Sequence, residues 1–111
     1  MIYFGSCHCG AVNFEIETDL KNIKQCNCSI CKRKNAKMNL VSKDKLKITK
    51  GEDNIALYEF GTKQAKHYFC KTCGIYTHHI RKSDPNGIGV NISCLEGVDS
   101  FKFSAEVLDN K

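Results

Sequence analysis

The sequence predicts a single, mainly β domain with short helical turns, organised around bound metal. The chain has 111 residues, a length typical of one domain. Short apolar stretches alternate with turns rich in Gly, Asp and Asn, which is the pattern of strands in a β protein. The chain also has eight cysteines. All but one of them fall in three clusters whose neighbouring thiols are separated by one or two residues, which is the spacing of metal ligands.

The first two strands are expected at residues 2–6 and 11–17, and apolar and polar side chains alternate in the second of them. Residues 7–10 form the bend between these strands. Gly10 allows the tight backbone turn that a pair of metal-binding thiols requires. The other elements predicted in this half are a single helical turn at 29–34 and strands at 23–25, 38–42 and 46–49.

The second half is predicted to be a run of strands with the clearest hairpin of the chain at its centre. Residues 75–81 and 88–94 form the two arms of this hairpin. Its connection, 83–87, places Pro at the second position of a turn and Gly at the fourth, where both residues are favoured. The other strands predicted in this half are 55–60, 65–69 and 101–108.

The register of this hairpin decides where the lone Cys94 lies. If Asp84 and Gly87 close the turn, Thr77 lies opposite Cys94. Cys94 is then at the end of the hairpin that follows the third cysteine cluster. The expectation is that its thiol comes within reach of a metal site.

The cysteines could instead form disulfides, because an even number of cysteines is common in small secreted domains. Two observations favour metal. The first residues contain no basic region, long apolar run or cleavage site, so we expect no secretory signal and a cytoplasmic location. Thiols separated by one or two residues also close very small, strained disulfide loops. Redox chemistry of the thioredoxin type would need a βαβ context, which the pattern does not predict.

The cysteine clusters divide unevenly, and this suggests two different zinc sites. The two doublets combine economically into one closed tetrahedral site, formed by Cys7, Cys9, Cys70 and Cys73. The triplet, Cys26, Cys28 and Cys31, would bind a second ion through three ligands. Such a site keeps a position open for water or substrate, as catalytic zinc does. The alternative is that Cys94 supplies the fourth ligand and that both sites are structural.

The charge gives little support for a nucleic-acid partner. The formal net charge of +5 counts cysteine as neutral, whereas two filled zinc sites with seven thiolates would lower it to about +2. Lys32, Arg33 and Lys34 follow the triplet and could hold the carboxylates of an anionic ligand, although they equally fit an ordinary exposed turn. No stretch approaches the ~20 apolar residues of a membrane span.

Three of the histidines, His8, His78 and His79, are candidates for further metal ligands. His8 stands between two predicted ligands, so its side chain should point away from the ion. His78 and His79 are expected on opposite faces of a strand, so that at most one of them faces inward. A solvated or core role is expected for both rather than metal ligation.

Four motifs in this order resemble one known family, the glutathione-dependent formaldehyde-activating enzymes, also called the centromere protein V family. The motifs are GSCHCGAVNF at 5–14, CNCSIC at 26–31, FCKTCGIYT at 69–77 and GVNISCLEG at 89–97. The resemblance extends from Gly5 to about Phe103, and it implies one formaldehyde-activating-enzyme-like domain over residues 1–111.

The resemblance implies a β-tent fold, in which small antiparallel sheets are held by zinc. It implies that Cys7, Cys9, Cys70 and Cys73 form a closed structural site. The triplet would correspond to the second, catalytic or labile zinc of the family. The implied reaction is the addition of glutathione to formaldehyde to give S-hydroxymethylglutathione, or the reverse cleavage. An open zinc there would polarise the aldehyde oxygen or hold the glutathione thiolate.

Three hypotheses of function follow. The first is a zinc-dependent carbon–sulfur lyase that acts on the adduct of an aldehyde with glutathione or another thiol, with Cys26, Cys28 and Cys31 at the catalytic ion. The second is a non-catalytic zinc module that binds protein or nucleic acid. Both of its sites would be closed, and a contiguous basic face would bind nucleic acid in a salt-dependent way. The third is a thiol-based metal or redox sensor that loses zinc reversibly on mild oxidation.

Overall fold

The computed structural model describes residues 1–81 and 84–109. In this part of the chain the strands form two sheets, which confirms the prediction of a mainly β protein. The smaller sheet is antiparallel, in the order β1-β2-β5. Its strands are β1 (Ile2–Ser6), β2 (Asn13–Glu17) and β5 (Leu46–Lys50).

The larger sheet has seven strands within the described residues, in the order β10-β3-β4-β9-β8-β7-β6. They are β3 (Ile23–Cys26), β4 (Met38–Ser42), β6 (Ile55–Tyr58), β7 (Lys66–Cys70), β8 (Tyr76–Ile80), β9 (Gly87–Asn91) and β10 (Glu106–Leu108). The last strand pairs with β3 in parallel, and the other pairs of this sheet are antiparallel.

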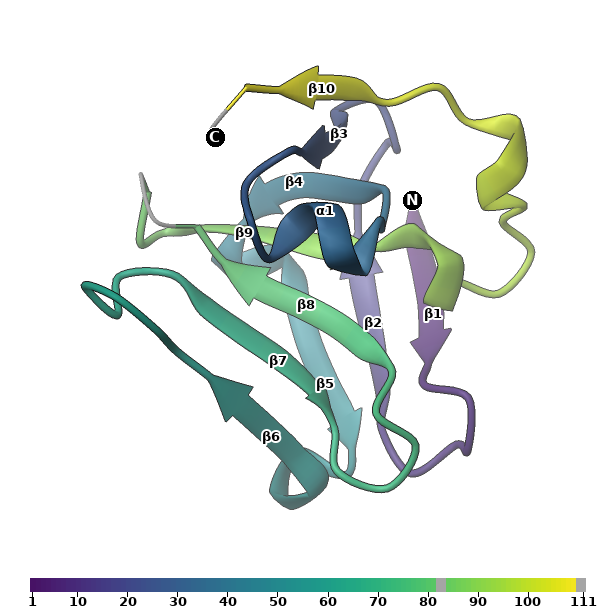
Figure 1. Ribbon diagram of the computed structural model, residues 1–111. Helices are drawn as coiled ribbons and strands as arrows, with labels where there is room; N and C mark the ends of the chain where they lie inside the picture. Colours follow the sequence, from purple (N-terminus) through teal and green to yellow (C-terminus); the bar gives the residue numbers. More distant parts are fainter. Residues whose placement is uncertain (82–83, 110–111) are drawn as a thin grey trace.

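A single-turn helix, α1 (Cys31–Lys34), lies in front of the larger sheet in Figure 1, over β4, β8 and β9. It begins inside the predicted helical turn at 29–34. The smaller sheet lies behind the larger one in the same view. The larger sheet therefore has one face toward α1 and the other toward the smaller sheet.

The hydrophobic core fills the space between the two sheets. Phe14 and Ile16 from β2 pack there against Ile88 and Val90 from β9, and all four side chains are almost completely buried. In β2 these side chains alternate with less buried ones, as the period of a strand requires, whereas every residue of β9 is buried. The other buried members of this core are Ile23, Ile92 and Leu95.

Several predicted strands end earlier or begin later than expected, among them 88–94, 55–60 and 101–108. The strand 88–94 ends at Asn91, because the Asn91 side chain accepts a hydrogen bond from the Ser93 N–H and starts the 3₁₀ turn Ile92–Cys94. The strand 55–60 ends at Tyr58. The stretch 101–108 is split into the 3₁₀ turn Ser100–Lys102 and β10.

The predicted register of the β8–β9 hairpin is wrong. The turn from Asp84 to Gly87 does form, since the Gly87 N–H donates to the Asp84 carbonyl at 2.9 Å. However, this turn lies within a longer connection, because the Arg81 N–H donates to the Gly87 carbonyl and His78 lies opposite Val90. Cys94 therefore does not face Thr77. Residue 83, the first of the predicted connection, is outside the described residues.

No helix in the described ranges is long and apolar enough to cross a membrane.

Candidate metal centres and the groups beside the cysteine triplet

The structure brings the thiols of Cys7, Cys9, Cys70 and Cys73 together into one cluster. Two of them come from the bend between β1 and β2, and the other two from the end of β7 and the turn after it. The Cys9 sulfur lies 3.7 Å from the sulfurs of both Cys7 and Cys70. Sulfur atoms arranged tetrahedrally around zinc at about 2.3 Å are about 3.8 Å apart, so this cluster fits a zinc ion.

The backbone around this four-cysteine cluster supports thiolates. The Val12 N–H donates to the Cys7 sulfur at 3.3 Å, and the Thr72 N–H donates to the Cys70 sulfur at 3.4 Å. Backbone N–H groups of Cys9 and Ile75 lower the pKa of Cys73 to about 6. Hydrogen bonds to a sulfur favour its ionised form, which is the form that binds metal.

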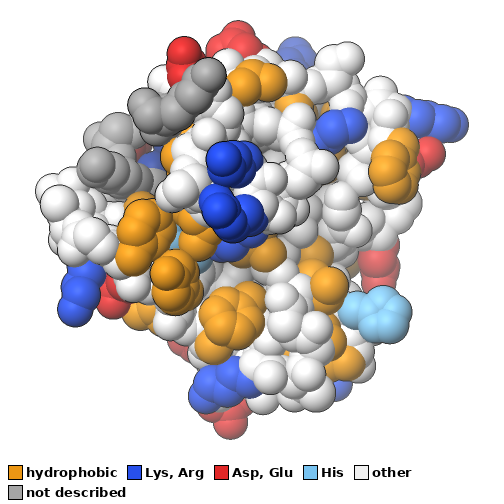
Figure 2. All heavy atoms as spheres, viewed as in Figure 1, with side chains coloured by type: hydrophobic (Ala, Val, Ile, Leu, Met, Phe, Trp, Pro, Cys, Tyr) orange, Lys and Arg blue, Asp and Glu red, His pale blue; other side chains and the backbone are white. Residues whose placement is uncertain are grey.

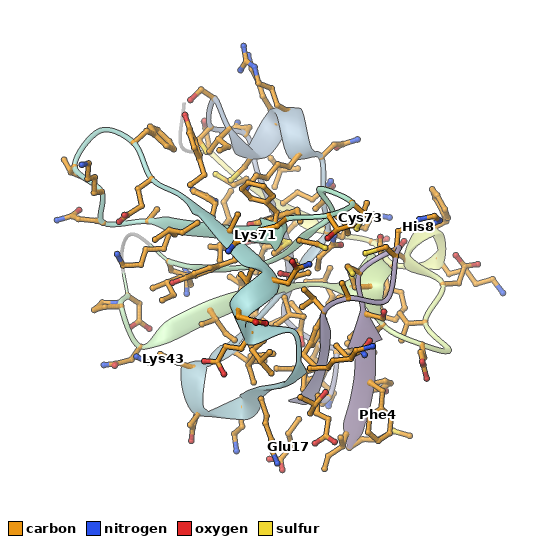
Figure 3. The ribbon with its side chains drawn as sticks, turned by 90° about the horizontal axis from the view of Figure 1, so that it is seen from below. Phe4, His8, Glu17, Lys43, Lys71 and Cys73 are labelled. Carbon is orange, nitrogen blue, oxygen red and sulfur yellow. The ribbon has the colours of Figure 1, made fainter. Side chains whose placement is uncertain are left out.

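Two glycines shape the turns around this cluster, and His8 lies outside it. Gly10 and Gly74 follow the two cysteine pairs with φ of 81° and 76°, a left-handed conformation that glycine adopts without strain. His8 is exposed. Figure 3 shows its side chain at the outer surface of the loop beside Cys73, pointing away from the cluster as predicted.

The triplet of Cys26, Cys28 and Cys31 also forms a cluster, with all three sulfurs within 4.8 Å of one another. Cys26 ends β3 and Cys31 begins α1, so a tight turn aims the three thiols at one point. Each of the three residues is half-buried. Among the residues that the structure describes, no further His, Cys, Asp or Glu joins this cluster as a fourth ligand.

The surroundings of Cys28 and Cys31 have opposite effects on the ionisation of their thiols. Burial opposes its ionisation, but backbone N–H groups of Cys31 and Ile30 and the side chains of Cys31 and Cys26 outweigh burial and lower its pKa. The pKa of Cys31 is raised instead, by burial and then by Cys28 and Cys26. Backbone N–H groups thus favour negative charge at Cys28, just before α1.

Cys94 belongs to neither cluster. It lies in the 3₁₀ turn after β9, and its sulfur contacts the Tyr76 carbonyl oxygen at 3.7 Å. Burial and then the thiols of Cys7 and Cys73 raise its pKa to about 12. The geometry therefore places Cys94 nearer the four-cysteine cluster than the triplet, and it does not supply a fourth ligand to the triplet.

A row of polar and aromatic side chains lies beside the triplet. The sequence singled out Lys34 and His79 but gave no sign that they lie together with Tyr76. The ammonium group of Lys34 lies 3.5 Å from the centre of the Tyr76 ring. The Tyr76 hydroxyl forms a 2.8 Å hydrogen bond with Nδ1 of His79. Burial and then the thiolates of the triplet raise the pKa of Tyr76, which keeps its phenol protonated.

A β-bulge explains why Tyr76 and His79 lie on the same face of β8. Tyr68 pairs with His78, but its neighbour Phe69 pairs with Tyr76, so Thr77 is an extra residue in the ladder. The extra residue shifts the alternation of side chains by one position. No signal in the sequence predicts this bulge.

The two neighbouring histidines of β8 lie on opposite faces, as predicted, but the expectation that at most one faces inward is wrong. His78 is 8% exposed and stacks on Tyr68, with ring centres 4.6 Å apart, on the face toward the smaller sheet. His79 lies on the face toward α1, where burial is the main cause that lowers its pKa to about 3. Both faces of this sheet are covered, so both imidazoles are largely removed from water.

His67 extends the row away from the triplet. Its ring lies 5.9 Å from that of His79 and 6.1 Å from that of Phe60. The side chain is 2% exposed, yet neither ring nitrogen has a hydrogen-bond partner among the described residues. Burial and then the Lys34 charge lower the pKa of His67 to about 4, so the ring is neutral near pH 7.

The other basic residues of α1 lie away from this row. Lys32 and Arg33 are exposed, and the Arg33 guanidinium donates to the Ser29 carbonyl at 2.6 Å. Figure 2 shows Lys and Arg side chains over α1, with hydrophobic side chains beside them. Of the three consecutive basic residues, only Lys34 is half-buried against the sheet.

Comparisons with known proteins agree with this geometry. The model of the glutathione-dependent formaldehyde-activating enzyme family matches residues 2–110. The chain also resembles the crystal structure of a Rhodobacter sphaeroides protein studied by structural genomics, with 42% sequence identity and a TM-score of 0.90. That match covers 95% of this chain and 99% of the other. Since the family model spans nearly the whole sequence, the chain belongs to the glutathione-dependent formaldehyde-activating enzyme family.

Proposed function

We propose that the chain, acting as one domain over residues 1–111, is a zinc-dependent enzyme of the carbon–sulfur lyase type. Its substrate would be the adduct of an aldehyde with glutathione or another thiol, such as S-hydroxymethylglutathione. The observation that carries this proposal is the difference between the two cysteine clusters. One offers four sulfurs and is complete, whereas the triplet offers three half-buried sulfurs with no fourth ligand among the described residues.

The proposed reaction forms one C–S bond and breaks the π bond of one carbonyl group. In the synthetic direction the thiol loses its proton, the sulfur attacks the aldehyde carbon, and a C–S bond forms. The π electrons of the carbonyl move to oxygen, which takes up a proton to give the hydroxyl of the adduct. Zinc bound at the triplet would act as a Lewis acid and lower the pKa of a bound thiol.

Groups of the chain itself would favour the ionised form of a thiol at this site. Backbone N–H groups of Cys31 and Ile30 favour the thiolate form of Cys28, which is the form that would bind a metal ion. Cys26, Cys28 and Cys31 are each half-buried, so part of each residue remains accessible from solvent. A cytoplasmic location is part of the proposal, because glutathione is present there and keeps thiols reduced.

Zinc content, measured with and without glutathione, tests this proposal first. We expect two zinc ions per chain, one of which is lost or changes its coordination when glutathione is added. Two ions indifferent to glutathione, or one ion even after incubation with excess zinc, would contradict the assignment of the triplet.

An activity assay provides the second test. The exchange of formaldehyde between its free form and the glutathione adduct can be followed by NMR, and the protein should accelerate it. Cys28→Ser should remove the acceleration, whereas Cys94→Ser, which changes a thiol outside both clusters, should retain it. If instead the protein binds nucleic acid with a salt-dependent affinity and leaves the exchange unchanged, the alternative of a binding module is favoured.

A further inference from the structure

Lys34 is a half-buried cation whose ammonium group contacts an aromatic ring and, in the described part of the chain, no carboxylate. Three lysines of the described part form ion pairs with carboxylates: Lys24 with Glu106, Lys45 with Glu17, and Lys66 with Glu59. Lys34 has no carboxylate partner among the described residues. Its ammonium group is half-buried and lies over the Tyr76 ring at 3.5 Å.

The helix directs Lys34 toward the triplet. Residues three apart on a helix lie on the same side, so Lys34 shares a side with Cys31 while its neighbours Lys32 and Arg33 are exposed. Burial and the thiols of the triplet have opposite effects on the pKa of Lys34. Burial lowers the pKa of its ammonium to about 8, and thiolates at Cys31 and Cys28 oppose this effect. The ammonium group of Lys34 therefore belongs to the side of α1 that also carries the Cys31 thiol.

Tyr76 holds the ammonium group in this position. Its ring provides the negative face that attracts a cation. The hydrogen bond to His79 fixes the ring, and Gly89 opposite His79 leaves room for the imidazole. The position of Lys34 thus depends on a chain of contacts that begins in the middle of the larger sheet.

We propose that Lys34 is the anion-binding residue of the triplet site and that Tyr76 is its positioning residue. This inference rests on the proposed function, because the anion would be the oxygen that gains charge when sulfur adds to the aldehyde carbon. A fixed cation beside that oxygen stabilises the charge as it develops. The same cation would attract a carboxylate-bearing thiol to the site.

Alkylation of the cysteines tests the cation without any enzymatic assay. The purified protein is treated with iodoacetate, which is anionic, or with iodoacetamide, which is neutral, and the rates at each cysteine are read by peptide mass spectrometry. A cation beside the triplet should raise the ratio of the iodoacetate rate to the iodoacetamide rate there. In Lys34→Met this ratio should fall about fivefold at the triplet, and it should stay unchanged at the four-cysteine cluster.

Matched variants separate this effect from a general change of charge. Lys32→Met removes the same charge from an exposed position in the same helix, and it should leave the ratio at the triplet unchanged. Tyr76→Leu should lower the ratio as Lys34→Met does, because the ammonium loses its support. Tyr76→Phe keeps the aromatic face and should recover most of the ratio, and Lys34→Arg should do the same.

The adduct-exchange assay then links the cation to the reaction. We expect Lys34→Met to lower kcat for the glutathione–formaldehyde adduct about 100-fold while the zinc content stays at the wild-type value. Equal alkylation ratios in Lys34→Met and wild type would overturn the anion-binding role. A changed ratio in a protein whose wild type does not accelerate exchange would instead contradict the proposed reaction and leave the anion site standing.

Discussion

The imidazole of His79 occupies the space that a side chain at Gly89 would need. The two residues lie opposite each other on β8 and β9. A Cβ atom built on Gly89 would lie 2.3 Å from Cε1 of His79, closer than Cβ atoms lie to other heavy atoms in real structures. Only glycine at position 89 lets the His79 ring lie this close to the backbone of β9. His79 in turn fixes the Tyr76 hydroxyl through their hydrogen bond.

Gly89→Ala should destabilise the protein because the new methyl group displaces the His79 ring. We expect a loss of about 1–3 kcal/mol in the free energy of unfolding, measured by urea denaturation. The double variant Gly89→Ala/His79→Ala removes the ring that clashes. Its destabilisation should be smaller than the sum of the two single changes, and strict additivity would show that the two residues do not compete for this space.

His67→Phe should stabilise the protein. The imidazole is buried among the rings of Phe60, Tyr76 and His79, and neither of its nitrogens has a partner in the described part of the chain. An unpaired buried polar group costs about 1–3 kcal/mol, and a phenyl ring fills a similar space without that cost. Thermal unfolding should show a higher Tm for the variant. A lower Tm would mean that the nitrogens of His67 do have partners in solution.

Most strands could be predicted from the sequence because their signals are local. The alternation of apolar and polar residues locates β2, and the turn residues around it limit its length. Where a side chain competed with the strand, the prediction was wrong. Asn91 ends β9 by capping the next turn, and nothing in the apolar pattern of 88–94 indicates that competition.

The two cysteine clusters could be predicted because close spacing in the chain limits where the thiols lie. The combination of Cys7 with Cys70 followed from counting ligands, and the structure brings these residues together. The row from Lys34 to His67 could not be predicted in the same way. It depends on the bulge at Thr77 and on α1 covering one sheet face, and both arise from tertiary packing.

The free energy of unfolding should decrease as the pH is lowered below about 6.5, partly because His78 is buried as a neutral group. Its pKa is lowered to about 4 by burial, against about 6.5 in an unfolded chain. Between these two values the unfolded state binds a proton that the folded state does not. Protonation thus stabilises the unfolded state, and the free energy of unfolding decreases as the pH falls through this window.

The variant His78→Phe isolates this contribution, because phenylalanine keeps the stacking on Tyr68 but does not titrate. Between pH 7.5 and pH 5 the variant should lose about 2 kcal/mol less stability than the wild type. Denaturation curves at the two pH values measure the difference. Parallel losses in the two proteins would show that His78 is not protonated on unfolding.

Loss of metal from the four-cysteine cluster should unfold the protein, whereas loss from the triplet should not. The first cluster joins positions far apart in the chain, since Cys9 and Cys70 are separated by 61 residues. The triplet joins only a short local segment from Cys26 to Cys31. A cross-link that closes a loop of this size lowers the conformational entropy of the unfolded chain, which stabilises the fold by about 4 kcal/mol, and a short loop contributes less.

Cysteine variants measure this difference. Cys70→Ser should lose one zinc ion and its cooperative thermal transition, because zinc binding at such a site contributes about 10 kcal/mol, as much as the whole stability of a small domain. Cys28→Ser should lose the other ion and keep a transition within a few degrees of the wild type. Cys94→Ser removes a thiol outside both clusters and should retain two ions. If Cys28→Ser unfolds like Cys70→Ser, the triplet holds the fold together, and its proposed role as an open site is wrong.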